Sequence, residues 1–566
     1  MQTANRRARL ARWCVQRAWS PVRWQRLALV SVLLVLTLVL AAIGTAERHR
    51  QANLPMTWPQ LLDHVYALYI YLVPQNSLQF AKDLHWSETV GRIIGPLVPV
   101  AGIVWLVRRR ALGELAELLI RYGASGHGVI LGKDGSADAL ALASAEAGEV
   151  VVLVDPSVVD EKDRLVRLGC AGVICRAQPP ASLERAGTLA LWRPLDAENI
   201  AKAIELREAG TTGTREIHLS VQSADLQRAL LKVPALMEQG GARLRPHSLA
   251  GMSVRASLAG PQLAELALRR GSRQVTICLW GDSPALVWAA ELALRQFWSI
   301  RLGPPRVIWA DRPAHLPLPE ALAKLADFAT AVFSPDERPT FQRMSRDDAV
   351  HDATVTCHLV DAGHADATVA ASFALAARLR QAFADPPPVQ AVLANTITDA
   401  AAPLFVTNDL CFRPPILPGE GLTLQALVDR AQDEEAARIQ IAYNARYGRD
   451  GAAPASGPWQ DLAETFVAAN RAAADHRAIK LWDARTSGLS DAELIEGLAV
   501  MEHNRWCAER LLSGWAPSGD GPRDDVRWLH PDLKPWDGLS EEARQKDRDA
   551  VSDLLKAQRS PAARLP

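Results

Sequence analysis

The stretch GVILGKDGSADALALASAEAGEVVVLVD, residues 128–155, decides the fold of this 566-residue chain. Its first five residues form an apolar run typical of a buried parallel strand, and residues 150–154 form a second such run. Between them, residues 137–147 are mostly alanine and leucine, which favours a helix. A strand, a helix and a strand in this order form a βαβ unit, so the sequence predicts an α/β fold with a parallel sheet.

The turn after the first strand carries candidate nucleotide-binding residues. Gly132, Gly135 and Ser136 lie in this turn, and Asp155 follows Gly132 at a spacing close to that of ribose-binding carboxylates in dinucleotide folds. The second glycine of the usual GxGxxG turn is replaced by Asp134, whose negative charge would repel a pyrophosphate. Two interpretations stay open: the lobe binds NAD or another nucleotide, or it keeps the architecture and has lost or changed its ligand. Asp155 is accordingly a ribose contact or a polar residue at a strand end.

A similar pattern restarts at residue 274 and predicts a second doubly wound lobe. Gly281 is the only glycine in the turn after its first strand, which argues against nucleotide binding and favours a structural or dimerising role. The predicted strands are residues 275–280, 306–309, 354–360 and 389–394, and the predicted helices are residues 285–296 and 366–383.

Several segments of the first lobe carry a family resemblance. ASLERAG at residues 181–187, LAL at 189–191, Glu198-Asn199 and EIHLSV at 216–221 resemble the nucleotide-binding lobe of TrkA-type proteins and regulator-of-potassium-conductance domains. The resemblance covers residues 126–235. It implies a lobe that lies on the cytosolic side of a pore or transporter, dimerises, and senses nucleotides or ions.

The C-terminal region carries a second set of motifs. They are HNRW at 503–506, Arg510, GW at 514–515, RDD at 523–525, HP at 530–531 and PW at 535–536. With these motifs, residues 455–556 resemble the RyR repeat, a small helical domain named after ryanodine receptors and found also in bacterial proteins beside TrkA-type lobes. The resemblance implies a ligand-binding or regulatory module that senses a nucleotide-like signal.

The same region supplies candidate ligand contacts. His503, Trp506 and Arg510 share a helix face, and an indole, an imidazole and a guanidinium can together stack a base and hold a phosphate. The alternative interpretations are that the tryptophans anchor a small core, that the histidines are structural, and that Arg523 pairs with Asp524. The candidate ligand-binding residues are Arg471, His503, Trp506, Arg510, Arg523 and His530.

The N-terminal region contains two apolar runs. Residues 27–46 carry no charge, and twenty helical residues match the roughly 30 Å hydrocarbon core of a bilayer. Seven arginines and no acidic residue precede this run, which predicts a cytosolic N-terminus. Residues 93–107 form the second run and end at three arginines. Between the runs, residues 65–73 are a re-entrant or interfacial helix in this interpretation, and the TVGYG filter of potassium channels is absent.

Composition and motifs restrict the class of function. The 63 basic and 63 acidic residues balance, so composition does not support nucleic-acid binding. The seven cysteines are scattered without a CxxC pair, which is typical of free thiols. No GxSxG elbow, HExxH, GxxxxGK[ST] or clustered metal ligands are present, so we expect no enzyme activity, no catalytic residue and no metal.

The sequence therefore predicts an α/β plus α architecture: a two-helix transmembrane hairpin, two Rossmann-like doubly wound cytosolic lobes, and a helical RyR-like domain. The expected parts are a basic cytosolic N-terminus at 1–26, the hairpin at 27–110, the two lobes at 126–250 and 272–415, and the helical domain at 416–566.

The expected function is that of a ligand-regulated, channel-like membrane effector in which the cytosolic domains sense a nucleotide-type signal. Expected partners are the lipid bilayer, a nucleotide-like ligand and further copies of the chain. The expected location is the inner membrane, with both termini in the cytoplasm. The alternatives are a potassium channel or transport subunit gated by NAD or ATP, a membrane-tethered NAD-dependent oxidoreductase, and a non-conducting membrane scaffold.

Overall fold

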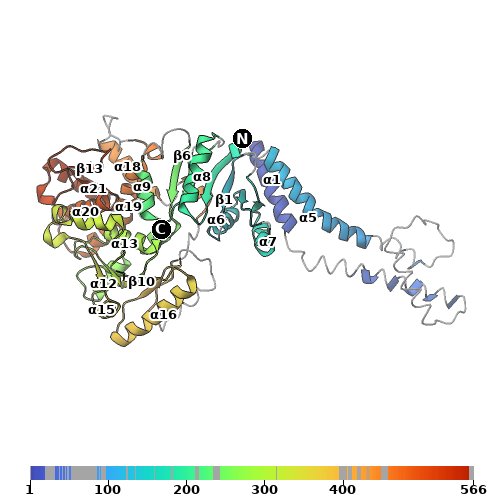
Figure 1. Ribbon diagram of the computed structural model, residues 1–566, viewed down its shortest axis with the longest axis horizontal. Coiled ribbons are helices and arrows are strands. Elements are labelled where there is room, and N and C mark those ends of the chain that lie inside the picture. The colour runs from blue at the N-terminus through green and yellow to red at the C-terminus, as the bar shows by residue number, and fades with distance from the viewer. Residues whose placement is uncertain are drawn as a thin grey trace. The chain divides into compact units, whose positions relative to one another are not determined.

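The computed structural model of the chain (Figure 1) describes most of residues 97–559 and separate pieces of the region before them. It forms two compact units, Met1–His127 with Gly148–Gly187, and Gly128–Ala147 with Thr188–Pro566. The described residues are 2–19, 32, 34–36, 39–40, 42–44, 46–47, 50–51, 86–87, 90 and 97–559, the last range without 123–124, 134, 159, 180–182, 211–213, 215, 234–236, 238–241, 311, 314, 394–404, 406–410, 417–421, 430–432 and 448–456.

The first unit is organised around a helix pair. Helix α1 (Gln2–Trp19) lies along α5 (Leu97–Tyr122) and also contacts α7 (Lys162–Ala171) (Figure 1). Small side chains on α1 allow this close approach, because they bring the two backbones together without a void. The buried residues of the pair are Ala8, Ala11, Cys14 and Val15 on α1 and Ala116 and Ile120 on α5.

The first sheet has six strands in the order β3-β2-β1-β4-β5-β6, which is the strand order of dinucleotide-binding folds. The pairs β2/β3, β4/β5 and β5/β6 are parallel. The predicted parallel sheet of the first lobe is therefore confirmed. The strands are β1 (His127–Gly132), β2 (Val151–Val154), β3 (Ile174–Arg176), β4 (Ala186–Trp192), β5 (Glu216–Ser220) and β6 (Arg243–His247), with helices α6 (Gly135–Glu146), α8 (Asp196–Glu208) and α9 (Ala224–Leu231).

The second sheet has five strands in the order β11-β10-β7-β8-β9, and every neighbouring pair is parallel. The predicted second Rossmann-like sheet is confirmed, with one strand, β9, that the sequence did not indicate. The strands are β7 (Thr276–Gly281), β8 (Arg306–Ala310), β9 (Thr340–Met344), β10 (Cys357–Asp361) and β11 (Val389–Ala391), and the helices are α11 (Leu249–Leu258), α12 (Gln262–Arg269), α13 (Pro284–Gln296), α14 (Glu320–Val332), α15 (Arg346–His351) and α16 (Ala365–Ala382).

The turn after β7 is closed by protein atoms. Gly281 has a φ of +118°, and a Cβ there would lie 1.8 Å from the carbonyl oxygen of Asp361. The indole Nε1 of Trp309 donates a hydrogen bond of 2.6 Å to the carbonyl oxygen of Gly281. Only glycine fits this position, and the reason is packing within the chain.

The C-terminal region is helical and shares a hydrophobic core with the second sheet. Leu498, Leu511 and Trp515 belong to the same buried cluster as Leu294 and Phe297 at the end of α13. The region therefore packs as part of the second unit. Its elements are α17 (Leu424–Asp429), α18 (Glu434–Tyr447), α19 (Glu464–Thr486), α20 (Asp491–Leu512) and α21 (Glu541–Arg559), with the short parallel pair β12 (Ala516–Pro517) and β13 (Leu529–His530).

The prediction of a transmembrane hairpin is wrong for the described chain, in which no helix combines the length and the apolar character needed to cross a bilayer. In α5, residues 97–107 span only about 16 Å before Arg108, Arg109 and Arg110, roughly half of a hydrocarbon core. Much of the run at 27–46 and all of 65–73 lie outside the described residues. The predicted multi-pass location with two cytoplasmic termini depended on these spans and is corrected with them.

Candidate functional site

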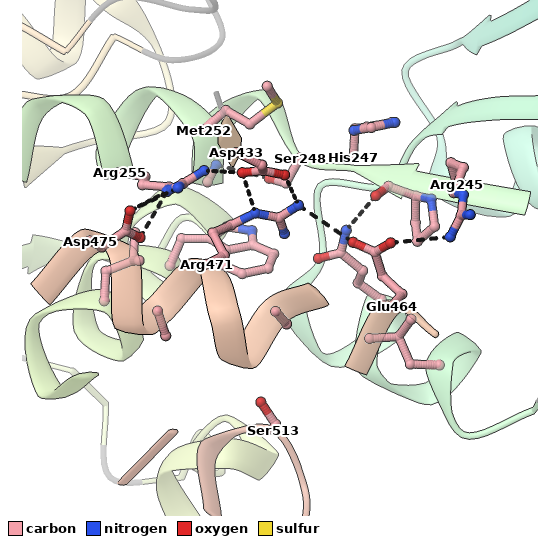
Figure 2. A pocket seen from close by; sticks show the side chains of 18 of the residues that line it. Arg245, His247, Ser248, Met252, Arg255, Asp433, Glu464, Arg471, Asp475 and Ser513 are labelled. Carbon is pink, nitrogen blue, oxygen red and sulfur yellow. Dashed lines mark hydrogen bonds and ion pairs between the residues drawn. The ribbon is translucent and has the colours of Figure 1, made fainter. Parts of the chain in front are cut away.

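A cavity of about 170 Å³ lies in the second unit (Figure 2). Its walls come from the end of the first sheet and helix α9, from helices α11 and α13 beside the second sheet, and from helices α17 and α19 of the helical region. The lining residues are His218, Gln227, Arg228, Leu231, Arg245, Pro246, His247, Ser248, Gly251, Met252, Arg255, Trp288, Leu292, Arg295, Gln296, Ala426, Leu427, Asp433, Glu464, Ala468, Arg471, Ala472, Asp475 and Ser513.

The edge of the first sheet shapes one end of the cavity. Strand β6 ends at His247, and Ser248 then caps α11 by accepting a 3.0 Å hydrogen bond from the backbone N–H of Gly251. A Cβ on Gly251 would lie 3.0 Å from the ring of Trp288, so α11 and α13 pack closely there. The carboxyl end of a parallel strand and the start of the next helix commonly border a ligand crevice in α/β proteins.

The centre of one wall is a buried carboxylate between two arginines. Figure 2 shows Asp433 between Arg255 and Arg471. Arg471 donates to the carboxylate through Nε at 2.9 Å and Nη2 at 2.6 Å, and Arg255 donates through Nη1 at 3.0 Å. Burial by itself would raise the pKa of Asp433, but the two guanidinium groups hold it well below its usual range. Asp433 is therefore ionised at neutral pH.

Further carboxylates extend this group in both directions into a chain of alternating charges (Figure 2). Arg255 Nε donates to Asp475 at 2.8 Å. On the other side, Arg471 Nη2 lies 3.6 Å from Glu464, whose other oxygen accepts a 3.3 Å hydrogen bond from Arg245. The chain thus joins β6, α11 and α19 by ion pairs that are largely protected from water.

A second charged group borders the cavity on α13. The carboxylate of Glu291 is fully buried and accepts from Arg228 at 2.6 Å and from Arg295 at 3.0 Å. The indole of Trp288 also lines the cavity and donates its N–H to the carbonyl oxygen of Gln222 at 2.9 Å. An aromatic face beside guanidinium groups suits a planar polar ligand.

Two histidines from neighbouring strands meet at the sheet end of the cavity. The rings of His218 and His247 stack with centroids 5.2 Å apart, and His218 Nδ1 lies 3.0 Å from His247 Nε2. One nitrogen of this pair donates and the other accepts, so the contact requires that at least one ring nitrogen be unprotonated.

Of the predicted nucleotide-turn residues, Gly132, Gly135 and Ser136 belong to the second unit, and Asp155 belongs to the first. Asp155 is fully buried, accepts from the backbone and hydroxyl of Ser157 at 2.9 Å, and lies 2.7 Å from Arg164 Nη1. These contacts within the chain already engage its carboxylate.

The phosphate turn itself is partly described. A Cβ on Gly132 would lie 2.3 Å from the Cβ of Ala137 and 2.7 Å from the carbonyl oxygen of Trp192, so close packing requires glycine there. Gly135 and Ser136 open α6, and Asp134 lies outside the described residues. Nucleotide binding at this turn stays a prediction.

The predicted RyR-region residues gather in an aromatic cluster. The rings of His503 and Trp506 stack at 5.8 Å, and Trp506 meets His530 edge to face at 4.9 Å. The guanidinium groups of Arg510 and Arg523 lie 5.5 and 5.7 Å from the ring of Trp515. The structure thus brings these five residues together in one small domain, and ligand binding by them stays a prediction.

The two histidines of this cluster differ in charge. Burial lowers the pKa of His530 to about 4, so its ring is neutral at pH 7. For His503, burial acts in the same direction, but Cys507 and the carboxylate of Asp547, 3.6 Å away, raise the pKa well above its usual value. His503 also lies 2.8 Å from the carbonyl oxygen of Lys534, a contact that suits a donating ring nitrogen.

Arg471 lies apart from that cluster, among the residues that line the cavity. Its cavity neighbours Arg255 and Asp433 were not candidates in the sequence analysis. They are 178 residues apart in the chain, and neither lies in a recognisable motif. An isolated charged residue in a sequence does not indicate a binding site, because the site forms only when the fold brings such residues together.

Comparison with known protein families identifies a domain in one part of the chain. The RyR domain family matches residues 488–560, which confirms an RyR domain within the region where the sequence resemblance lay. No curated protein matches the chain.

Solved structures give only weak similarity. The "GsuK channel bound to NAD" is 13% identical, with 74% of this chain and 85% of that chain covered and a TM-score of 0.34. The "Crystal structure of the GsuK bound to ADP" is 15% identical, with coverages of 73% and 98% and a TM-score of 0.31. At these scores the similarity carries no argument about function.

Proposed function

We propose that the chain is a regulatory sensor whose cavity in the second unit binds a small nucleotide-like molecule. Guanidinium groups bind oxyanions with paired hydrogen bonds, and the Trp288 ring offers a surface for a planar base. The RyR domain at residues 488–560 supports a regulatory role, because the sequence resemblance associates this domain with ligand-dependent regulation.

The observation that carries the proposal is the composition of the cavity walls. The first sheet supplies Arg245 and His247, α13 supplies Trp288, and α19 supplies Ala468 and Arg471. A ligand that contacts all three parts stabilises the arrangement in which these contacts exist. Such differential binding between two arrangements is the physical requirement for a sensor.

We also propose that the chain regulates without catalysing a reaction. None of the nucleophile, metal or phosphate-loop motifs sought in the sequence is present. Its output would then be a conformational change of the second unit. A turnover assay with each compound that binds should show no chemical conversion.

Thermal unfolding of the full chain with a series of adenine nucleotides tests the proposal. A ligand at 100 times its Kd should stabilise the protein by about 2.7 kcal/mol. The substitution Ala468→Phe places a ring on the α19 wall of the cavity and should abolish the stabilisation without removing a charge. Ala473→Phe is the matched control, because Ala473 lies on the same helix and is partly buried but is not part of the cavity lining.

Two outcomes would contradict the proposal. One is the absence of stabilisation by every nucleotide tested with the unmodified chain. The other is a shift of equal size in Ala468→Phe, which would place the binding site outside this cavity.

A further inference from the structure

We propose that Arg255 and Arg471 form a subsite for a singly charged oxyanion of the ligand, and that Asp433 occupies this subsite while the ligand is absent. The inference rests on the proposed function and extends it in two respects. It specifies the charge of the group that the ligand presents. It also names the segment that the ligand displaces.

The geometry around Asp433 is that of a bound anion. Two guanidinium groups from different helices, α11 and α19, converge on one carboxylate through three hydrogen bonds of 2.6 to 3.0 Å. Arg471 donates one hydrogen bond to each carboxylate oxygen, which is the paired arrangement that arginine also makes with phosphate. Only 5% of the Asp433 side chain is exposed, yet the residue lines the cavity. A ligand oxyanion in the cavity could therefore take over the same donors.

The charges around the subsite determine which oxyanion fits. Without Asp433, Arg255 would keep Asp475 at 2.8 Å, and Arg471 would keep Glu464 at 3.6 Å. Arg245 also pairs with Glu464 and in turn with Glu216, so the surroundings hold three positive and three negative groups, of which Asp475 and Glu464 are the carboxylates next to the subsite. In the structure the subsite accepts one further negative charge. A dianion would bring a second negative charge close to these two carboxylates, where repulsion is weakly screened. A phosphodiester or a carboxylate matches the charge of Asp433, and a phosphate monoester at pH 8 exceeds it.

Displacement of Asp433 would release the start of α18, which begins at the next residue. Within the first turn, Glu435 lies 3.2 Å from Arg477, and farther along α18 Gln440 accepts from Asn470 at 2.7 Å. Loss of the Asp433 contacts therefore leaves the Glu435–Arg477 ion pair to hold the first turn of α18 and loosens this turn in part. Ligand binding would thus order the cavity and, at the same time, increase the mobility of the first turn of α18. This change in mobility would be the conformational signal of the sensor.

The test measures binding of four adenine compounds to the full chain and to Asp433→Asn at pH 8. Cyclic AMP carries a phosphodiester, adenosine 5′-carboxylate carries a carboxylate, AMP carries a dianionic monoester, and adenosine carries no charge. The neutral amide introduced by Asp433→Asn would hold the arginines less strongly than the carboxylate does, so this variant should bind the two singly charged compounds at least about tenfold more tightly. The affinity for adenosine should not change.

Two further variants separate charge from folding effects. Asp433→Glu keeps the competing charge and should bind like the unmodified chain. Asp347→Asn removes an exposed carboxylate that pairs with Arg378 on the surface, and it should leave all four affinities unchanged. A measurement on the unmodified chain needs no variant: saturating cyclic AMP should accelerate amide hydrogen exchange at the start of α18 severalfold.

Each contrary result has a distinct meaning. If a singly charged compound binds the unmodified chain but binds Asp433→Asn no more tightly, the subsite assignment is overturned and the proposed function stands. Preference of Asp433→Asn for AMP would overturn the charge rule, and slower exchange at the start of α18 would overturn the displacement. If no compound binds either form, the subsite proposal is overturned. The proposed function then fails as well if the wider nucleotide series also gives no stabilisation.

Discussion

The glycine at position 132 has two possible explanations, a ligand contact and close packing. The sequence pattern associates it with a phosphate turn, where glycine allows the backbone to approach a ligand. In the structure, a Cβ at this position would meet Ala137 at 2.3 Å and the carbonyl oxygen of Trp192 at 2.7 Å. Packing alone therefore requires glycine here, and its presence is no evidence for a bound nucleotide.

Gly132→Ala should lower the free energy of unfolding by about 2 kcal/mol or more, because a methyl group cannot be placed without moving a strand or a helix. Gly113→Ala is the control: Gly113 lies within α5 and has no neighbouring atom within 4 Å of its added Cβ, so the change should stabilise the helix by about 1 kcal/mol. Denaturant unfolding measures both effects. Equal stability of Gly132→Ala and the unmodified chain would show that the turn has room.

At the scale of one element, α20 carries three of the six candidate ligand-binding residues, His503, Trp506 and Arg510. Its start is defined by a capping box in which Ser490 accepts from the backbone N–H of Glu493 at 3.4 Å, and Glu493 accepts from the backbone N–H of Ser490 at 3.0 Å. Farther along the helix, His503 and Trp506 enter the aromatic cluster. The cap therefore stabilises the first turn of the helix that carries these side chains.

Ser490→Ala should destabilise the helical region by about 1 kcal/mol, because the first turn loses an acceptor for its free backbone N–H groups. Ser490→Thr keeps a hydroxyl and should recover most of the loss. The midpoint of thermal unfolding is a suitable measurement. A threonine variant as unstable as the alanine variant would indicate that the hydroxyl does not cap the helix.

At the scale of the whole molecule, a buried carboxylate connects the helical region to the second α/β lobe within the second unit. Asp483 on α19 accepts from the hydroxyl of Ser299 at 2.8 Å and from the backbone N–H of Ile300 at 3.1 Å. Burial raises the pKa of Asp483 to about 6, although Ser299, Ile300 and Arg301 act in the opposite direction. The connection therefore depends on pH.

The sign of this dependence follows from proton binding. Between its ordinary pKa of 3.8 and the folded value of about 6, the folded state holds a proton that the unfolded state has lost, so the free energy of unfolding falls as pH rises. The penalty is complete above about pH 6 and amounts to about 3 kcal/mol. Asp483→Asn should remove this part of the slope. Parallel stability curves for variant and unmodified chain from pH 4 to 7 would contradict the assigned shift.

The sequence by itself determined the two parallel α/β sheets and the RyR domain. Their signals are local, since apolar runs, helix-forming segments and short motifs each lie within a few tens of residues. Local apolar runs also led to the wrong prediction of membrane-spanning helices. In α5 only 11 residues, 97–107, precede the three arginines, which is too few to cross a bilayer.

Only the tertiary structure decided the cavity. The sequence singled out Arg471, but its partners Arg255 and Asp433 lie 178 residues apart and, as isolated charged residues, are indistinguishable from surface residues. These side chains form a site because they are buried together. Burial strengthens each charge interaction and requires every charge to have a partner. The burial of these charged side chains is a property of the folded chain, and no local pattern in the sequence encodes it.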